Sequence, residues 1–289
     1  MQENNIAAGV VLYHPQPSFL SNISTYYSDI DKLIVIDNSE TQDPLILKNL
    51  QSLFPDVEYR YLNRNAGIAA ALNIACNIAI PYNCNWILTM DQDSSFIDNQ
   101  FSQMVARISG VVSQFKKIGI ISPFHVLHEH DLPKKTEQYT VKNIAMTSGN
   151  LLNVDAYTRT GPFEEKLFMD YVDYEYCLRL RKNKFLIIQD NLVLLKHSLG
   201  DFAIKKIFRQ KIGVSNHNSL RRYYMTRNSI YVGFKYFAVD KRFFFHMLKN
   251  IFFWDPFIIV TYEKDKLAKL KAVYKGILHF VFNKFGKVI

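Results

Sequence analysis

Residues 86–94 read Trp-Ile-Leu-Thr-Met-Asp-Gln-Asp-Ser, an apolar run that ends at two carboxylates separated by a single residue. The run is short and holds no glycine or proline, so it predicts a strand that is buried on both faces. Similar runs and stretches of helical spacing alternate before it, with strands expected at 6–13, 32–36 and 58–62 and helices at 18–27, 45–54 and 67–80.

This alternation predicts an α/β fold with a mostly parallel central sheet flanked by helices, because strand–helix–strand crossovers place successive strands in parallel. Each predicted strand ends in polar residues, at 13–15, 37–39, 63–67 and 91–94. In an open α/β sheet the ligand binds beyond the carboxyl ends of the strands. The four polar clusters are therefore expected to form one site.

The chain continues with less regular spacing after the fourth strand. We expect helices at 101–115 and 170–182, strands at 118–122 and 185–195, a loop or hairpin at 127–140, and a break at Ser148-Gly149 within 145–154. The composition shifts near Asp201. We therefore expect one domain over residues 1–203, divided at about residue 95, and a helical, basic C-terminal extension over 204–289.

Charge and aromatic residues are distributed unevenly over the 289 residues, whose net charge is +9. Residues 204–289 hold 18 Lys and Arg against 4 Asp and Glu, a charge of +14, and 19 of the 41 aromatic residues, whereas residues 1–203 carry −5. This asymmetry predicts different partners for the two parts. The overall composition, 48% hydrophobic and 21% charged, excludes a disordered chain.

Cysteine usage and hydropathy bear on the compartment. Cys76, Cys84 and Cys177 form no CxxC pair, so neither a zinc ribbon nor a disulfide framework is predicted, and a reducing, cytoplasmic setting is expected. The N-terminus has no basic segment before its apolar run, which argues against a signal peptide. The longest candidate for a membrane span, 250–262, is short and interrupted by Asp255-Pro256, so a soluble or peripheral protein is expected.

Asp91 and Asp93 are the first candidates for chemistry. Carboxylate oxygens suit Mg²⁺ or Mn²⁺, and such an ion holds a diphosphate; the alternative is a surface turn with solvated acids. His197, just past a predicted strand, supplies a neutral nitrogen to complete an Asp/His metal site, although a lone histidine is more often structural.

Two further motifs also have structural explanations: the structural one is the better for Asn65-x-Gly67 alone, and it is about as good as the functional one for Asp37. Asn65-x-Gly67, at the start of an Ala-rich helix, presents backbone N–H groups to an anion or nucleotide, or is a plain N-cap followed by a permissive glycine. Asp37 either accepts a hydrogen bond from the imide N–H of uracil or thymine or is a turn former in Asp-Asn-Ser.

The stretch Asp170-Tyr-Val-Asp173-Tyr-Glu175 places three carboxylates near the start of a helix and among aromatic residues. Acids at a helix N-terminus are stabilising in themselves. A half-buried carboxylate among aromatics is also the typical environment of a general base, which we favour here.

Taken in order, these motifs resemble those of the family 2 glycosyltransferases, which have the GT-A fold. The resemblance covers residues 5 to about 230 and rests on the following ordered set: Tyr13-His14-Pro15, Asp37-Asn38-Ser39, Asn65-x-Gly67-x-Ala69-x-Ala71-x-Asn73, Asp91-Gln92-Asp93, Ser148-Gly149-Asn150, the acidic stretch from Asp170 to Glu175, and His197-x-x-Gly200. A last motif, Arg222-Tyr223-Tyr224-x-x-Arg227-Asn228, resembles the rhamnosyltransferase branch, which builds bacterial surface polysaccharides such as O-antigen from dTDP-L-rhamnose.

The resemblance implies a nucleotide-binding half over about 1–95, an acceptor half over 96–203, and a role for each motif. Nucleotide-sugar binding falls to Tyr13, His14, Asp37, Asn65, Gly67, Asn73 and Asp91, and the divalent metal, Mn²⁺ or Mg²⁺, to Asp91, Asp93 and His197. Contacts with the acceptor or a diphosphate fall to Ser148, Gly149, Asp170, Glu175, Arg222, Tyr223, Tyr224 and Arg227. Asp173 becomes the catalytic base, because position 172, where the family often has an acid, is Val.

The implied reaction is metal-dependent transfer of L-rhamnose from dTDP-L-rhamnose to a sugar hydroxyl, with inversion at the anomeric carbon. A carboxylate base deprotonates the acceptor on the opposite face, and no carboxylate nucleophile is needed. The alternatives are the same fold with a UDP-sugar donor, as a hexosyl or galactofuranosyl transferase, and a non-catalytic membrane-bound scaffold with a degenerate fold.

The C-terminal region interleaves basic and aromatic residues, from Lys205, Lys206, Arg209 and Lys211 through Phe252-Phe253-Trp254 to a helix at 263–275. This pattern suits an anionic membrane surface and a polyprenyl-diphosphate-linked acceptor, at the inner face of the plasma membrane. The alternative is a helical subdomain with a solvated basic face. No nucleic-acid-binding motif is present, so nucleic acid is not an expected partner.

Overall fold

The computed structural model describes residues 5–126, 137–197, 203–207, 210–214 and 216–288, with backbone alone at 203–207 and 210–214. The predictions for 127–136, for Gly200 and Asp201, and for Arg209 lie outside the described residues. So do the side chains of Lys205, Lys206 and Lys211.

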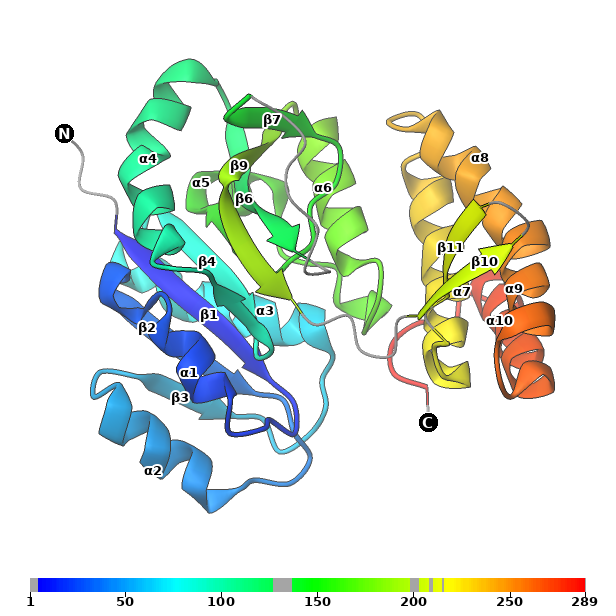
Figure 1. The fold of residues 1–289 in the computed structure, drawn as a ribbon, viewed down its shortest axis with the longest axis horizontal. Coiled ribbons are helices and arrows are strands. Elements are labelled where there is room, and N and C mark those ends of the chain that lie inside the picture. The colour runs from blue at the N-terminus through cyan, green and yellow to red at the C-terminus, as the bar shows by residue number, and fades with distance from the viewer. Residues whose placement is uncertain (1–4, 127–136, 198–202, 208–209, 215, 289) are drawn as a thin grey trace.

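The main sheet has nine strands in the order β3-β2-β1-β4-β8-β6-β9-β5, with β7 paired to β9 (Figure 1). Their bounds are β1 Ile6–Leu12, β2 Lys32–Asp37, β3 Glu58–Tyr61, β4 Trp86–Asp91, β5 Ser94–Phe96, β6 Ile118–Val126, β7 Tyr139–Lys142, β8 Asn150–Asn153 and β9 Leu186–His197. Strands β1, β2, β3, β4, β6 and β9 run in one direction, and β5, β7 and β8 run against it. The predicted α/β fold with a mostly parallel sheet is confirmed.

Helices cover both faces of this sheet: α1 Phe19–Ser24, α2 Pro44–Leu53, α3 Ile68–Ala79, α4 Gln100–Gln114, α5 Val154–Thr160 and α6 Val172–Lys182. Single 3₁₀ turns lie at Tyr27–Asp29, Ile80–Tyr82 and Glu165–Leu167. Strand β1 is apolar throughout because both of its faces are buried. Ala7 and Val11 belong to the buried cluster with α3 and α6, whereas Val10 and Leu12 belong to the cluster with α1, α2 and α4.

The C-terminal extension is only partly helical. Residues expected in a helical region form an antiparallel hairpin, β10 Ala203–Ile207 with β11 Gln210–Val214, before the helices begin. The helices are α7 Ser219–Lys235, α8 Lys241–Lys249, α9 Asp255–Tyr262 and α10 Lys266–Val281, with a π-helical turn at Asn250–Trp254. Figure 1 shows this unit beside α6, with the last residues returning toward the main sheet.

The expectation that Asp255-Pro256 interrupts the apolar segment is wrong. The π-helical turn joins α8 to α9 into one helical stretch, Lys241–Tyr262, of 22 residues. Pro256 lies in the first turn of α9, directly after the π-helical turn. A proline is tolerated at the start of a helix, where its missing N–H does not interrupt the hydrogen bonding, so the helical stretch continues. The stretch is long and apolar enough to cross a membrane by length and composition, and 22% of its most apolar window is buried.

Candidate active site

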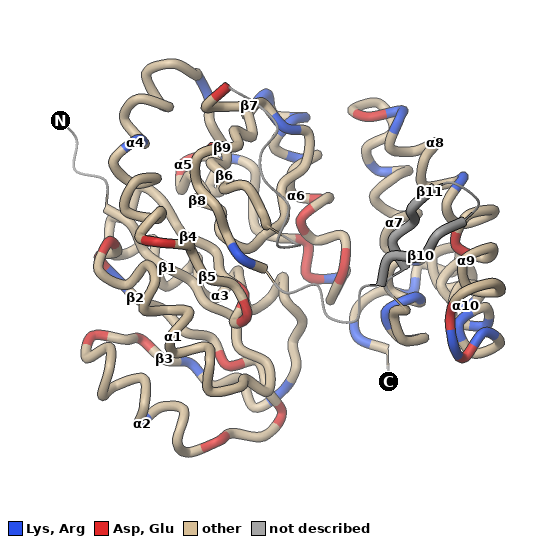
Figure 2. Tube along the Cα trace, viewed as in Figure 1, with Lys and Arg blue, Asp and Glu red and all other residues tan. Residues whose placement is uncertain are grey.

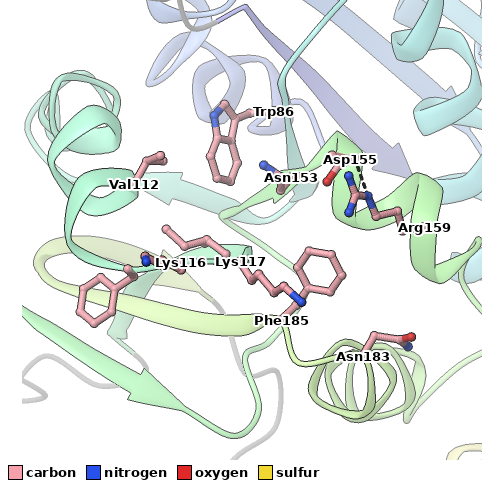
Figure 3. Close-up of a pocket in the computed structure, with 11 residues that line it drawn as sticks. Trp86, Val112, Lys116, Lys117, Asn153, Asp155, Arg159, Asn183 and Phe185 are labelled. Atoms are coloured by element: carbon pink, nitrogen blue, oxygen red, sulfur yellow. Dashed lines mark hydrogen bonds and ion pairs between the residues drawn. The ribbon is translucent and has the colours of Figure 1, made fainter.

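A cleft of about 280 Å³ opens at the carboxyl ends of β1 and β4, where the polar clusters were expected to meet. Its wall is formed by Val11, Tyr13, Asn38, Asn65, Gly67, Ile68, Asp91, Gln92, Asp93, Phe168, Met169 and His197. A larger hollow of about 530 Å³ lies at the opposite edge, between Trp86 and Phe185 (Figure 3). Its one acid, Asp155, is paired with Arg159, so the chemistry points to the smaller cleft.

Asp91, Asp93 and His197 bring together side-chain atoms of the kind that can hold a metal ion. Their carboxylate and imidazole atoms all lie within 4.8 Å of one another. The pairing of β5 with β9 explains this, because it places Ser94 opposite His197 and so brings the Asp91–Asp93 turn to the end of β9. Ser94 Oγ lies 2.7 Å from His197 Nδ1, and Asp93 Oδ1 lies 3.6 Å from the same nitrogen.

The donor set fits a divalent cation. Burial raises the pKa of Asp91; a charged His197 would oppose this, and the neighbouring Asp93 adds to it. Two carboxylates that repel each other in a partly desolvated place are stabilised by a positive ion between them. Two oxygens and one nitrogen suit Mn²⁺ or Mg²⁺ and leave coordination positions for phosphate oxygens.

Asp173, in the first turn of α6, is the candidate base. Burial raises its pKa to about 6; the Tyr174 N–H opposes the shift, and the charges of Asp170 and Asp91 increase it. Asp173 lines a separate small cavity with Thr89 and Asn150 and does not belong to the lining of the cleft. Asp173 Oδ1 accepts a hydrogen bond from Tyr174 N at 2.8 Å, which fixes the side chain. A carboxylate with a pKa near neutrality is suited to accept a proton from a hydroxyl.

Two carboxamides line the end of the cleft where the sequence predicted the nucleotide. Asn38 Oδ1 accepts from Ala66 N at 2.7 Å, and Asn38 Nδ2 donates to Asn65 Oδ1 at 3.2 Å. Asp37 lies behind them, fully buried, with its carboxylate accepting from Tyr59 Oη and Ser39 N. Asp37 therefore orders the loop, and the adjacent Asn38 lines the cleft in its place.

The end of β1 is fixed by Gln92. Its side chain accepts from Tyr13 N at 2.7 Å and donates to Tyr13 O at 3.1 Å, which ties β1 to the Asp91–Asp93 turn. Tyr13 lines the cleft, as expected for a nucleotide-sugar-binding residue. His14 is exposed and lies 3.1 Å from Glu40, outside the cleft lining.

Ser148 and Gly149 support the metal-binding turn from beneath. Ser148 Oγ accepts from Asp91 N at 3.1 Å, and Gly149 N donates to Thr89 O at 2.7 Å. Gly149 has a φ of +82°, and a Cβ there would lie 2.7 Å from Leu195 Cδ2, so only glycine fits. Both residues are placed to position Asp91, which differs from the acceptor or diphosphate contact expected of them.

Two other predicted site residues are buried in structural networks. The Asn73 side chain accepts from Phe163 N and donates to Phe163 O, which joins α3 to the loop before α6. Glu175 is fully buried and pairs with Arg179 and Lys235. Neither lines the cleft. The structure corrects both assignments, because each polar group is already satisfied within the protein.

The motif from Arg222 to Asn228 is buried on α7. Arg222 pairs with Glu263 and Asp255, and Arg227 is fully buried with its guanidinium bonded to backbone carbonyls. Tyr223 and Tyr224 are buried too and contact the guanidinium of Arg227 through their rings. The expected contacts with a diphosphate are therefore corrected to packing contacts. Asp170 is nearer the surface and pairs with Arg221 at 3.0 Å.

Several residues at the site were not predicted from the sequence. Asn38, Gln92, Phe168 and Met169 line the cleft. His125 Nε2 lies 2.7 Å from Ser148 O, and burial lowers the pKa of His125 to about 4, so the ring is neutral and donates to that carbonyl. Asn38 and Gln92 lie inside motifs already noted, so their position was the available signal; His125 gave none.

Comparison with known sequences finds one family whose pattern matches part of this chain. The pattern of "Glycosyl transferase family 2" matches residues 16–154, which include β2, α3 and the Asp91–Asp93 turn. The dTDP-rhamnosyl transferase RfbF of Shigella flexneri is 28% identical to this chain over 246 residues, covering 78% of this chain and 79% of RfbF.

Solved structures show the same fold. Residues 1–349 of S. aureus TarS in complex with UDP-GlcNAc superpose with a TM-score of 0.62 at 10% identity, over 94% of this chain and 80% of that one. GalNAc-T7 with UDP, GalNAc and Mn²⁺ gives a TM-score of 0.56 at 10% identity, over 71% of this chain and 44% of that one. This chain thus spans less than half of GalNAc-T7. The likeness establishes the GT-A architecture.

Proposed function

We propose that this chain is a family 2 glycosyltransferase and that it transfers L-rhamnose from dTDP-L-rhamnose to a sugar hydroxyl with inversion at the anomeric carbon. The similarity to RfbF over most of both chains carries the choice of donor. Two features support the reaction type: Asp91, Asp93 and His197 cluster in the cleft, and burial raises the pKa of the Asp173 carboxylate to about 6.

The donor lies along the cleft with its base against Asn38 and Asn65 and its diphosphate near Asp91 and Asp93. The two carboxylates and His197 would hold Mn²⁺ or Mg²⁺, and such an ion would supply positive charge against the leaving phosphates. Asp173 takes the proton from the acceptor hydroxyl as that oxygen attacks the anomeric carbon from the face opposite the diphosphate. Each turnover releases dTDP and moves one proton to Asp173.

The choice of donor is tested by nucleotide release. We supply dTDP-L-rhamnose, UDP-glucose and UDP-galactofuranose in turn, each with Mn²⁺. Nucleotide release from dTDP-L-rhamnose is expected to be at least about tenfold faster than from the other two. A tenfold ratio corresponds to a difference of about 1.4 kcal/mol in transition-state binding between the donors. Turnover of a UDP-sugar alone would overturn the rhamnosyl assignment and leave the family intact.

We also propose that the acceptor is linked to a lipid at the inner face of the plasma membrane, and that residues 204–289 bind this surface while 1–203 hold the catalytic site. One face of the stretch Lys241–Tyr262 presents exposed apolar side chains: Phe245, Phe252, Phe253, Trp254, Phe257 and Val260. The opposite face is buried against the protein through Met247, Ile251 and Ile259. The helix therefore lies along a membrane interface and does not cross it.

Charge supports the same surface. Lys241, Arg242 and Lys249 are exposed on this stretch, and Figure 2 shows basic residues along α7, α8 and α10. Aromatic rings at headgroup depth and cations against phosphates are what an anionic bilayer binds. A large exposed aromatic patch would otherwise be a liability in water.

Vesicle binding tests this surface. The protein is expected to cosediment with vesicles of anionic phospholipid at low salt and to be released at high salt, because the electrostatic part is screened. The double substitution Phe252→Ser with Phe253→Ser is expected to weaken binding about tenfold, since two large apolar side chains no longer insert. The matched control, Leu45→Ser with Leu53→Ser, alters two exposed apolar residues of α2 and leaves binding unchanged. Equal binding by both double variants would contradict the proposed surface.

A further inference from the structure

The loop before α6 contains a strained turn at the cleft wall. Phe168 has a φ of +67° and a ψ of −63°, and Met169 N donates to Leu167 O at 2.9 Å, which together form a γ-turn with positive φ. Asp170 and Tyr171 also have positive φ, at +56° and +64°. Such conformations are rare for residues other than glycine, so the surroundings must hold them in place.

The buried motif on α7 holds this turn. Asn228 Nδ2 donates to three carbonyls of the turn, those of Leu167 at 2.8 Å, Met169 at 2.7 Å and Asp170 at 3.1 Å. Arg227 adds a bond from its guanidinium to Leu167 O at 3.1 Å. Arg227 Nε in turn donates to Asn228 Oδ1 at 2.9 Å, which orients the carboxamide. Both side chains are fully buried, so their bonds do not compete with water.

The other side of the turn contacts the cleft. Phe168 O accepts from Ile68 N at 3.0 Å, at the start of α3. Gly67 lies so close that a Cβ there would be 2.5 Å from Phe168 O. Phe168 and Met169 themselves line the cleft beside Asn65. A displacement of the turn would therefore move the wall against which the nucleotide end of the donor lies.

Residues 286–288 also contact the turn and the α7 motif (Figure 1). Gly286 N donates to Lys166 O at 2.8 Å, and Gly286 O accepts from Arg227 at 2.9 Å. Lys287 Nζ lies 3.4 Å from Asn65 O and 5.8 Å from the centre of the Phe168 ring. The C-terminal segment thus contacts both the turn and the nucleotide end of the cleft.

We propose that Arg227 and Asn228 are positioning residues for donor binding, which act by holding the turn at Phe168 in its strained conformation against Gly67 and Asn65. The inference rests on the proposed function only in that the donor occupies this cleft. It gives the buried arginine–asparagine pair a role in the site without contact with the substrate.

The test compares two buried asparagines. Asn228→Ala removes the three bonds to the turn, whereas the control Asn191→Ala removes bonds to Glu137 O and Thr140 Oγ1 at a buried place on β9 away from the cleft. Both are expected to lower the thermal unfolding temperature. Only Asn228→Ala is expected to weaken dTDP binding, by about tenfold in calorimetry with Mn²⁺, and to raise the donor KM more than it lowers kcat.

A second variant keeps the test decisive if Asn228→Ala does not fold. Arg227→Lys retains the buried charge but loses the forked contact with the carbonyls, and is expected to weaken dTDP binding about threefold. The same titrations with UDP separate this inference from the choice of donor: if UDP binds the wild type in place of dTDP, the loss should be seen on UDP. Unchanged nucleotide affinity in a folded Asn228 or Arg227 variant, or an equal loss in Asn191→Ala, would overturn the proposal.

Discussion

Replacing Asp173 with asparagine is expected to lower kcat about 10³-fold, the usual contribution of a positioned general base. Asparagine keeps the shape of the side chain and still accepts the hydrogen bond from Tyr174 N, but it does not accept a proton. Burial raises the pKa of Asp173, so at pH 7 its ionised carboxylate makes the folded state less stable relative to the unfolded chain. The asparagine variant should therefore unfold at a temperature no lower than that of the wild type at pH 7.

The pH dependence follows from the same residue. Asp173 must be deprotonated to act, and its pKa is about 6. The value of kcat/KM is therefore expected to fall about tenfold per pH unit below about pH 6.

The control for Asp173→Asn is Asp155→Asn, a change of the same kind in the first turn of α5, which is expected to keep wild-type activity. An Asp173→Asn enzyme that retains a tenth of wild-type kcat would exclude Asp173 as the base.

Removal of the metal is the second large effect. Treatment with a chelator, or the substitution Asp93→Asn, is expected to reduce the rate of nucleotide release about 10³-fold, since offsetting the leaving-group charge is worth several kcal/mol. Mn²⁺ should restore the chelated wild type and should not restore Asp93→Asn at the same concentration. The exposed Asp98, five residues further along, gives the control Asp98→Asn.

This prediction has a clear contrary outcome. Full activity in the chelator, with the metal content of the protein measured as zero, would mean that the Asp91, Asp93 and His197 set does not bind a catalytic metal.

The sequence was sufficient to predict the main architecture. Strands β1, β2 and β4 are buried on both faces, which produces continuous apolar runs, and their carboxyl ends carry the polar residues of the cleft. Asn65, Gly67, Asp91, Asp93 and His197 were predicted as one site, and all line one cleft. The common edge of a parallel sheet explains this success.

The remaining errors have physical causes. Strand β5 is three residues long and pairs only through its contact with β9, so no periodicity reveals it. A buried arginine that bonds to backbone carbonyls, such as Arg227, has the same sequence appearance as one that binds a phosphate. Asp37 and Glu175 differ from cleft acids only in burial, which depends on residues far away in the chain.

Binding of the intact donor decides whether this cleft is a metal-assisted site for dTDP-L-rhamnose. Calorimetric titration of dTDP-L-rhamnose into the wild-type protein with Mn²⁺ should give saturable one-to-one binding that UDP-glucose does not reproduce, and Asp93→Asn should abolish the Mn²⁺ dependence. Equal binding of dTDP-L-rhamnose by the wild type and Asp93→Asn, with or without Mn²⁺, would mean that Asp93 and a metal play no part in donor binding.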